Sequence, residues 1–155
     1  TAAPAPDQAR YGAGGKPKTE KQTPSSLSYC FYFEGGIASY VHHLNYTKEP
    51  KHDNIFYFAK EVGAIQIEIA LQYTDDLSEP VLTFANNITN PGGGTHLVGF
   101  RSALTRILNN YARAKGYLKE KDQNLSGEDV REGLTAVISV KVPDPQFEGQ
   151  TKDKL

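Results

Sequence analysis

A run of alternating side chains between residues 65 and 73 limits the fold of this chain more than any other feature. Ile65, Ile67 and Ile69 alternate with Gln66 and Glu68, and the alternation continues to residue 73. Successive side chains of a β-strand point to opposite faces, so a period of two is typical of a strand with one buried face. The chain must therefore form a sheet that this strand can join.

Flanking patterns predict three more strands, at residues 55–62, 81–85 and 136–142. Turn signals separate the first three strands in the chain, with Gly63 in the first turn and Pro80 in the second. We expect these three strands to pair in chain order as an antiparallel meander.

Two helices are predicted between the third and fourth strands. The first covers residues 95–115 and carries an apolar stripe that should pack on the sheet. The members of the stripe are Leu97, Phe100, Leu104, Ile107, Leu108 and Tyr111. A second, short helix should begin near Ser126, because Ser126 and Asp129 together resemble a capping box. The element order predicts an α+β sandwich, an antiparallel-rich four-stranded sheet with helices on one face.

Composition divides the chain into three segments. Residues 1–26 are rich in Ala, Pro, Gly and Lys and lack apolar periodicity, which predicts a flexible segment. Residues 27–54 should contain a strand, a short amphipathic helix that ends near Asn45, and a polar linker. The linker is the candidate boundary before the regular pattern of residues 55–155.

The charge balance excludes a strong overall attraction to nucleic acid or to a membrane. The 155 residues include 17 Lys and Arg and 18 Asp and Glu, and any DNA contact must therefore be local. The apolar runs are much shorter than a membrane span, so we expect a soluble, cytoplasmic protein with no membrane partner. The single cysteine, Cys30, excludes an intrachain disulfide and is interpreted as a small buried hydrophobe.

Three patterns could carry chemistry, and each also has a structural interpretation. Gly92, Gly93 and Gly94 precede a helix and could present amides to an anion, but a simple turn that begins the helix is favoured. The histidines lack partners at metal-ligand spacing, so no metal site is expected. The long helix carries Arg101 and Arg106 on a basic stripe, which could contact phosphates or form a solvated face.

Several long motifs resemble a known family. They lie at residues 34–41, 93–106, 119–122, 125–134 and 141–152. Together they closely resemble the ATPase subunit of bacterial type IIA DNA topoisomerases, with the DNA gyrase type nearest and the topoisomerase IV type next. The resemblance extends over about residues 29–155. It departs from the family pattern at Pro91 and Gly92, where relatives usually carry His and Glu, and at Leu97 and Val98, which replace acidic residues common after His96.

The resemblance implies a division of the chain. Residues 29–45 correspond to the last strand and helix of a GHKL-type ATPase domain, and residues 55–155 correspond to the transducer domain. That domain has a ribosomal-protein-like fold with a left-handed crossover. The family's nucleotide pocket, magnesium ligand and catalytic glutamate precede the part seen here. We therefore expect a piece of a longer protein, with ATP and Mg²⁺ used by the parent enzyme, none bound by this chain alone, and no hydrolysis by it.

The resemblance also implies site residues and partners. Gln150 and Lys152 would contact the γ-phosphate of ATP, Lys152 would be catalytic, and Arg101 and Arg106 are candidate DNA-facing residues. The expected partners are the rest of the ATPase subunit, a second copy in a dimer, a DNA-cleaving subunit similar to gyrase A, and double-stranded DNA. The implied function is to couple ATP binding and hydrolysis to gate closure and DNA strand passage, in an ATP-dependent isomerase.

Two alternative functions remain open from the sequence. The first is a free-standing nucleic-acid-binding module that uses the basic helix. The second is a structural dimerisation piece without nucleotide contact, in which Lys152 would be dispensable.

Overall fold

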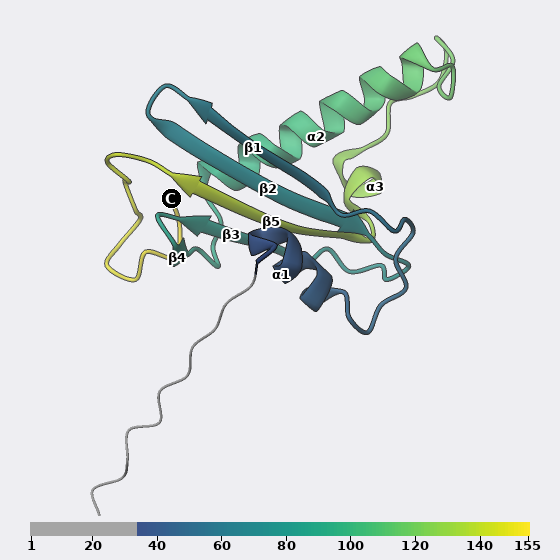
Figure 1. Cartoon of the computed structure of the whole chain (residues 1–155). Helices are drawn as coiled ribbons and strands as arrows, with labels where there is room; N and C mark the ends of the chain where they lie inside the picture. The colour runs from purple at the N-terminus through teal and green to yellow at the C-terminus, as the bar shows by residue number, and fades with distance from the viewer. Residues whose placement is uncertain (1–33) are drawn as a thin grey trace, which may run out of the picture. The chain divides into compact units, whose positions relative to one another are not determined.

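The computed structural model describes residues 34–155 (Figure 1). The elements are α1 (Gly36–Leu44), β1 (Phe56–Val62), β2 (Ile65–Tyr73), β3 (Val81–Ala85), β4 (Ile88–Thr89), α2 (Thr95–Ala114), α3 (Gly127–Arg131) and β5 (Leu134–Lys141). The segment of residues 1–26, the predicted strand at 27–33 and Cys30 lie outside the described residues. Among the described helices, none is both long enough and apolar enough to cross a membrane.

The five strands form one sheet in the order β1-β2-β5-β3-β4. The pairs β1 with β2, β2 with β5 and β3 with β4 are antiparallel, while β3 and β5 are parallel. The predicted meander is therefore wrong, because β5 lies between β2 and β3. Ala136, Val137 and Ile138 of β5 are all buried, so this strand is apolar on both faces and is best accommodated at the centre of the sheet.

The sheet has five strands rather than the four predicted. The additional strand, β4, pairs with β3 across Asn86 and Asn87, which have φ angles of 49° and 64°. Two consecutive positive φ angles are typical of the tightest hairpin turn, and Asn tolerates this conformation better than most residues. The Asn-Asn pair was thus a usable signal for a strand of only two residues.

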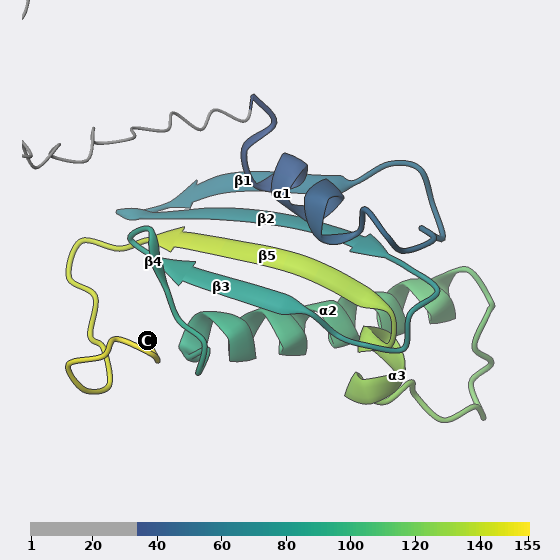
Figure 2. The same ribbon diagram turned by 90° about the horizontal axis from the view of Figure 1, so that it is seen from below.

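Helices cover both faces of the sheet, whereas the sequence predicted helices on one face (Figure 2). On one face, Val41 of α1 packs with Ala70 of β2 and Val137 of β5. On the other face, residues of α2, including Phe100, pack near Ile138. The prediction holds for α2 and α3, but α1, which the resemblance assigned to the end of the ATPase domain, covers the opposite face. The segment after α1 also bonds to the end of β2, through Lys51 N–H to Tyr73 O at 2.8 Å.

The connection between the parallel strands β3 and β5 passes through α2 and α3. When the sheet is viewed from the α1 face with these two strands pointing up, β5 lies to the right of β3 and the connection runs behind the sheet (Figures 1 and 2). Such a crossover is left-handed, whereas about 98% of such connections are right-handed. The unusual hand places α2 beneath the sheet with its start beside the end of the chain.

Only the first half of α2 packs on the sheet. Leu97 and Phe100 pack against the core, but Ile107 is 59% exposed and Tyr111 is 53% exposed. The prediction that the whole apolar stripe packs on the sheet is therefore wrong at Ile107 and Tyr111. With 20 residues the helix is about 30 Å long, and Figure 1 shows its second half extending past the strands.

Candidate functional site

The chain folds back after β5 into a closed loop of residues 148–154, here called the C-terminal loop. Glu148 N–H donates to Lys154 O at 2.8 Å, which closes the loop at its base. Phe147 and Leu155 flank the loop and pack against the core cluster of β5. Gln150 and Lys152 therefore lie on a loop that is fixed at both ends.

The glycine-rich segment before α2 holds this loop. Gly92 N–H donates to Asp153 O at 2.8 Å, and Thr95 N–H donates to Leu155 O at 3.0 Å. Gly94 has a φ of 143°, and a Cβ atom there would collide with the backbone of Leu155. The amides of Gly92 and Thr95 are thus occupied by carbonyl groups, in agreement with a turn that begins the helix rather than an open anion site.

The two side chains that the sequence singled out on the C-terminal loop are exposed. Lys152 Nζ lies 5.7 Å from the centroid of the Phe147 ring, a cation–π distance. Lys154 Nζ pairs with Glu148 Oε2 at 3.0 Å, whereas Lys152 forms no ion pair within the described part of the chain. The Lys152 ammonium can therefore meet an anion without first losing a carboxylate partner.

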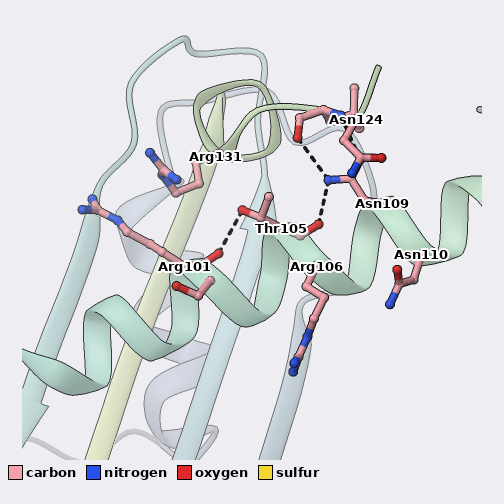
Figure 3. A pocket seen from close by; sticks show the side chains of 10 residues that line it. Arg101, Thr105, Arg106, Asn109, Asn110, Asn124 and Arg131 are labelled. Carbon is pink, nitrogen blue, oxygen red and sulfur yellow. Dashed lines mark hydrogen bonds between the residues drawn. The ribbon is translucent and has the colours of Figure 1, made fainter. Parts of the chain in front are cut away.

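A second candidate site is a pocket of about 520 Å³ between α2 and α3, here called the basic pocket (Figure 3). Arg101, Arg106 and Arg131 line it. Asn109 fixes its wall, because its side chain bonds to Thr105 O at 2.9 Å and to both backbone groups of Leu125. The structure thus brings the two predicted arginines to one pocket and adds a third.

The arginines of the basic pocket differ in their partners. Arg101 donates from Nε and Nη2 to Glu79 Oε1 at 3.1 and 2.8 Å, and Arg131 Nε lies 2.9 Å from the same oxygen. Arg106 points away from this group and has no ion pair among the described residues (Figure 3). Two of the three guanidinium groups are thus already neutralised in part by one carboxylate.

Arg113 and His52 have structural contacts. Arg113, further along α2, bonds to Asn124 Oδ1 at 2.9 and 2.6 Å and to two loop carbonyls, so it holds the α2–α3 connection. His52 accepts from Tyr73 N–H at 3.1 Å, which leaves its Nδ1–H to donate to Asn54 O. Within residues 34–155, no three His, Cys, Asp or Glu side chains are grouped so that they could hold a metal ion.

Two shifted pKa values mark opposite parts of the molecule. Both ring nitrogens of His96, near the start of α2, are buried without a partner among the described residues, and this burial lowers the pKa of His96. Ser126 donates its amide to Asp129 Oδ2 at 2.8 Å and accepts from Asp129 N–H, so the predicted capping box is confirmed. These hydrogen bonds lower the pKa of the Asp129 carboxyl.

Known proteins resemble this chain in sequence and in fold. A family model described as DNA gyrase B matches residues 36–155. The chain belongs to the DNA gyrase B family. The resemblance predicted from the sequence motifs is therefore confirmed.

Relatives within the gyrase B family are similar across most of this chain. It is 56% identical over 125 residues to the DNA gyrase B protein of Halalkalibacterium halodurans, covering 81% of this chain and 20% of the relative. It is 57% identical over 129 residues to that of Haloferax lucentense, covering 83% of this chain and 20% of the relative. The chain thus spans about a fifth of the length of these curated relatives.

A solved structure supports the same family at the level of the fold. The ATPase domain of Thermus thermophilus gyrase B, solved in complex with an aminocoumarin, has a TM-score of 0.71 and 40% identity to this chain. The match covers 77% of this chain and 32% of that one. This member of the gyrase B family thus corresponds to part of a type IIA topoisomerase ATPase region, and both the C-terminal loop and the basic pocket lie within the family match.

Proposed function

We propose that this chain is the transducer part of a gyrase-type ATPase subunit, and that its C-terminal loop senses the γ-phosphate of ATP. The observation that supports this proposal most strongly is the state of Lys152. Its side chain is exposed and without an ion pair among the described residues, while the loop that carries it is bonded to the start of α2. A fixed backbone with an available ammonium group is well suited to binding a phosphate.

Lys152 and Gln150 have different roles in this proposal. The Lys152 ammonium stabilises the negative charge that develops on the transferring phosphoryl group, and the Gln150 amide helps to keep that group in line. Both contacts require the γ-phosphate and are lost with ADP. Because a ligand shifts a conformational equilibrium only through differential contacts, this difference makes the nucleotide state detectable by the loop.

The fold offers a direct physical connection from the C-terminal loop to the basic pocket. Leu155 bonds to the first residue of α2, and Arg101 and Arg106 lie further along the same helix. A displacement of the loop therefore moves a packed element that carries the candidate DNA-facing residues. In this way ATP binding and hydrolysis would be coupled to gate closure and DNA strand passage.

The parent enzyme supplies the rest of the reaction. ATP is its substrate, and residues outside this chain hold the nucleotide and its Mg²⁺, so the chain alone is inactive. The partners are the rest of the ATPase subunit, a second copy in a dimer, a DNA-cleaving subunit similar to gyrase A, and double-stranded DNA, all in the cytoplasm. The division at residues 46–54 between ATPase domain and transducer belongs to the same proposal.

The decisive experiment is Lys152→Ala in the full-length protein. Loss of this charge should reduce ATP hydrolysis by about 10²–10³-fold, while nucleotide binding largely remains. Lys154→Ala is the matched control, because it removes the same charge from the same loop but disturbs only the exposed pair with Glu148. An unchanged rate in Lys152→Ala would refute the proposal.

A second candidate function, a free-standing nucleic-acid-binding module, is favoured by one observation: three arginines line the basic pocket. It requires that this chain alone binds duplex DNA, with an affinity that falls steeply with salt and with Arg106→Ala. Absence of duplex binding by the isolated chain would exclude it.

A further inference from the structure

We propose that Asn90 is a positioning residue for Lys152, acting through the Lys152 backbone. The inference rests on the proposed function of the C-terminal loop and adds a residue to it. Asn90 Nδ2 donates to Lys152 O at 2.7 Å, across 62 positions of the chain. Of the bonds that hold the loop, this one acts directly on the residue that carries the ammonium group.

Asn90 is itself held by the sheet. Its N–H donates to Thr83 O at 2.8 Å, and Thr83 Oγ1 donates to Asn90 O at 2.7 Å. Asn90 is 1% exposed and Thr83, on the inner strand β3, is 3% exposed. A continuous series of hydrogen bonds therefore runs from the sheet through Asn90 to Lys152, buried between Thr83 and Asn90 and part-buried at Lys152. Bonds removed from water in this way fix atoms more firmly than exposed ones.

The orientation of the Asn90 amide is determined by chemistry. Only its NH₂ group can donate to the Lys152 carbonyl, so the two ends of the amide cannot be exchanged without losing the bond. The other end, Asn90 Oδ1, is buried and has no partner among the described residues. Among the described residues, the Asn90 side chain therefore makes one hydrogen bond, and its partner is the carbonyl group of Lys152.

Lys152 adopts a backbone conformation that requires such support. Its φ is 57°, in the left-handed region that residues with side chains rarely occupy. Such a conformation persists where surrounding contacts determine it, and it is common at functional sites. The bond from Asn90 holds the peptide that follows Lys152. Without it, the peptide is free to rotate and the direction of the Lys152 side chain changes.

The position of the ammonium group matters because catalysis by a charged side chain depends on its placement. A displacement of about 1 Å at a reacting group can cost about 10²-fold in rate. The base of the loop would stay closed through the Glu148 and Gly92 bonds if Asn90 were lost. Loss of Asn90 should therefore misplace Lys152 without removing the loop.

The test uses Asn90→Ala and Asn90→Asp in the full-length protein. We expect Asn90→Ala to lower kcat for ATP by about tenfold, with KM changed by less than about twofold. Asn90→Asp should lower kcat further, because a carboxylate oxygen would then face the Lys152 carbonyl oxygen. Asn45→Ala is the control, since Asn45 is also buried and bonded through its side chain, to Gln72 and Thr135 on the α1 side of the sheet.

A double-mutant cycle separates positioning from a general loss of stability. In a Lys152→Ala background, Asn90→Ala should cause no further loss of kcat, because residues that act through one group are not additive. In the 155-residue chain, amide exchange at residues 151–153 should rise in Asn90→Ala and stay unchanged in Asn45→Ala.

The outcomes distinguish the two proposals. Suppose that Lys152→Ala is impaired. If Asn90→Ala then behaves as Asn45→Ala does, the role of Asn90 is overturned and the function of Lys152 stands. The same conclusion follows if Asn90→Ala lowers kcat by the same factor in the wild-type and Lys152→Ala backgrounds. If Lys152→Ala has normal activity, the proposed function fails and this inference fails with it.

Discussion

The C-terminal loop and the basic pocket both present positive charge, but the structure holds that charge in opposite ways. At the loop, the backbone of Lys152 is bonded to Asn90 while its ammonium group has no ion pair among the described residues. At the pocket, the guanidinium groups of Arg101 and Arg131 share one oxygen of Glu79. The loop therefore has a constrained backbone and an available charge, whereas two of the three arginines of the pocket are already paired with one carboxylate.

This difference predicts different responses to an anionic ligand. An anion at Lys152 gains an ionic contact without displacing a carboxylate, so binding there should depend on exact placement. An anion at the basic pocket must compete with Glu79 for Arg101 and Arg131, so binding there should depend on the balance of charge and on salt. The arrangement at Lys152 suits recognition of one phosphate group. The arrangement at the basic pocket suits an ionic contact that associates and dissociates readily.

The largest effect is expected from Gly94→Ala, which removes the support of the loop. The new Cβ would collide with Leu155 at a φ that other residues rarely adopt, so we expect a loss of about 3 kcal/mol of unfolding free energy. Urea denaturation measures it. Gly99→Ala is the control, because its Cβ would meet nothing within 4 Å inside α2 and should stabilise the chain by up to about 1 kcal/mol. Equal effects at both glycines would show that the loop is not held as described.

Arg106→Ala should have the next largest effect, at the basic pocket alone. Loss of an unpaired guanidinium should weaken duplex binding to the full-length protein by about 1 kcal/mol and lower its salt slope by about one unit. Fluorescence anisotropy at several salt concentrations measures both. Arg113→Ala is the comparison. Arg113 is hydrogen-bonded to Asn124, so its loss should make the α2–α3 connection less ordered and change the salt slope less. An unchanged salt slope in Arg106→Ala would remove Arg106 from the DNA-facing set.

Glu79→Gln should have a smaller effect of the opposite sign. Removing the shared carboxylate charge frees Arg101 and Arg131, so duplex affinity should rise by about threefold and its salt dependence should steepen. The same anisotropy titration measures it. Glu61→Gln on β1, which makes the same change of net charge outside the pocket, should leave affinity nearly unchanged. Equal gains in both variants would indicate a general charge effect.

The smallest effect is expected from mild acid, which should distinguish the start of α2, near His96, from the capping box of α3 at Asp129. The lowered pKa of His96 means that its contribution to stability is complete above its ordinary value of 6.5 and is lost as pH falls through its folded value. For Asp129, also lowered, the contribution is complete above 3.8 and is lost at lower pH. Between these limits, amide exchange should rise near the start of α2 while the capping box of α3 stays protected. Simultaneous loss at both places would contradict this order.

Sequence reasoning succeeded where local patterns determine structure. The alternation over residues 65–73 matched β2 at both ends, and Ser126 with Asp129 identified the start of α3. It failed for strand order, because the central place of β5 depends on the burial of both its faces and on contacts distant in sequence. The contacts of Glu79 with Arg101 and Arg131 join three separate elements, so no local pattern reports them. Asn90 was missed for the same reason, since its partner is 62 positions away.

The central position of β5 has a consequence for how the chain is made. During synthesis, β1 and β2 can form one hairpin and β3 and β4 another soon after each leaves the ribosome, because their partners are adjacent in sequence. Neither hairpin can join the other until Leu134–Lys141 emerges, since β5 pairs with both β2 and β3. Until then each hairpin exposes an unpaired edge of the kind that promotes aggregation. These residues therefore become a single folded sheet only after Leu134–Lys141 has been translated.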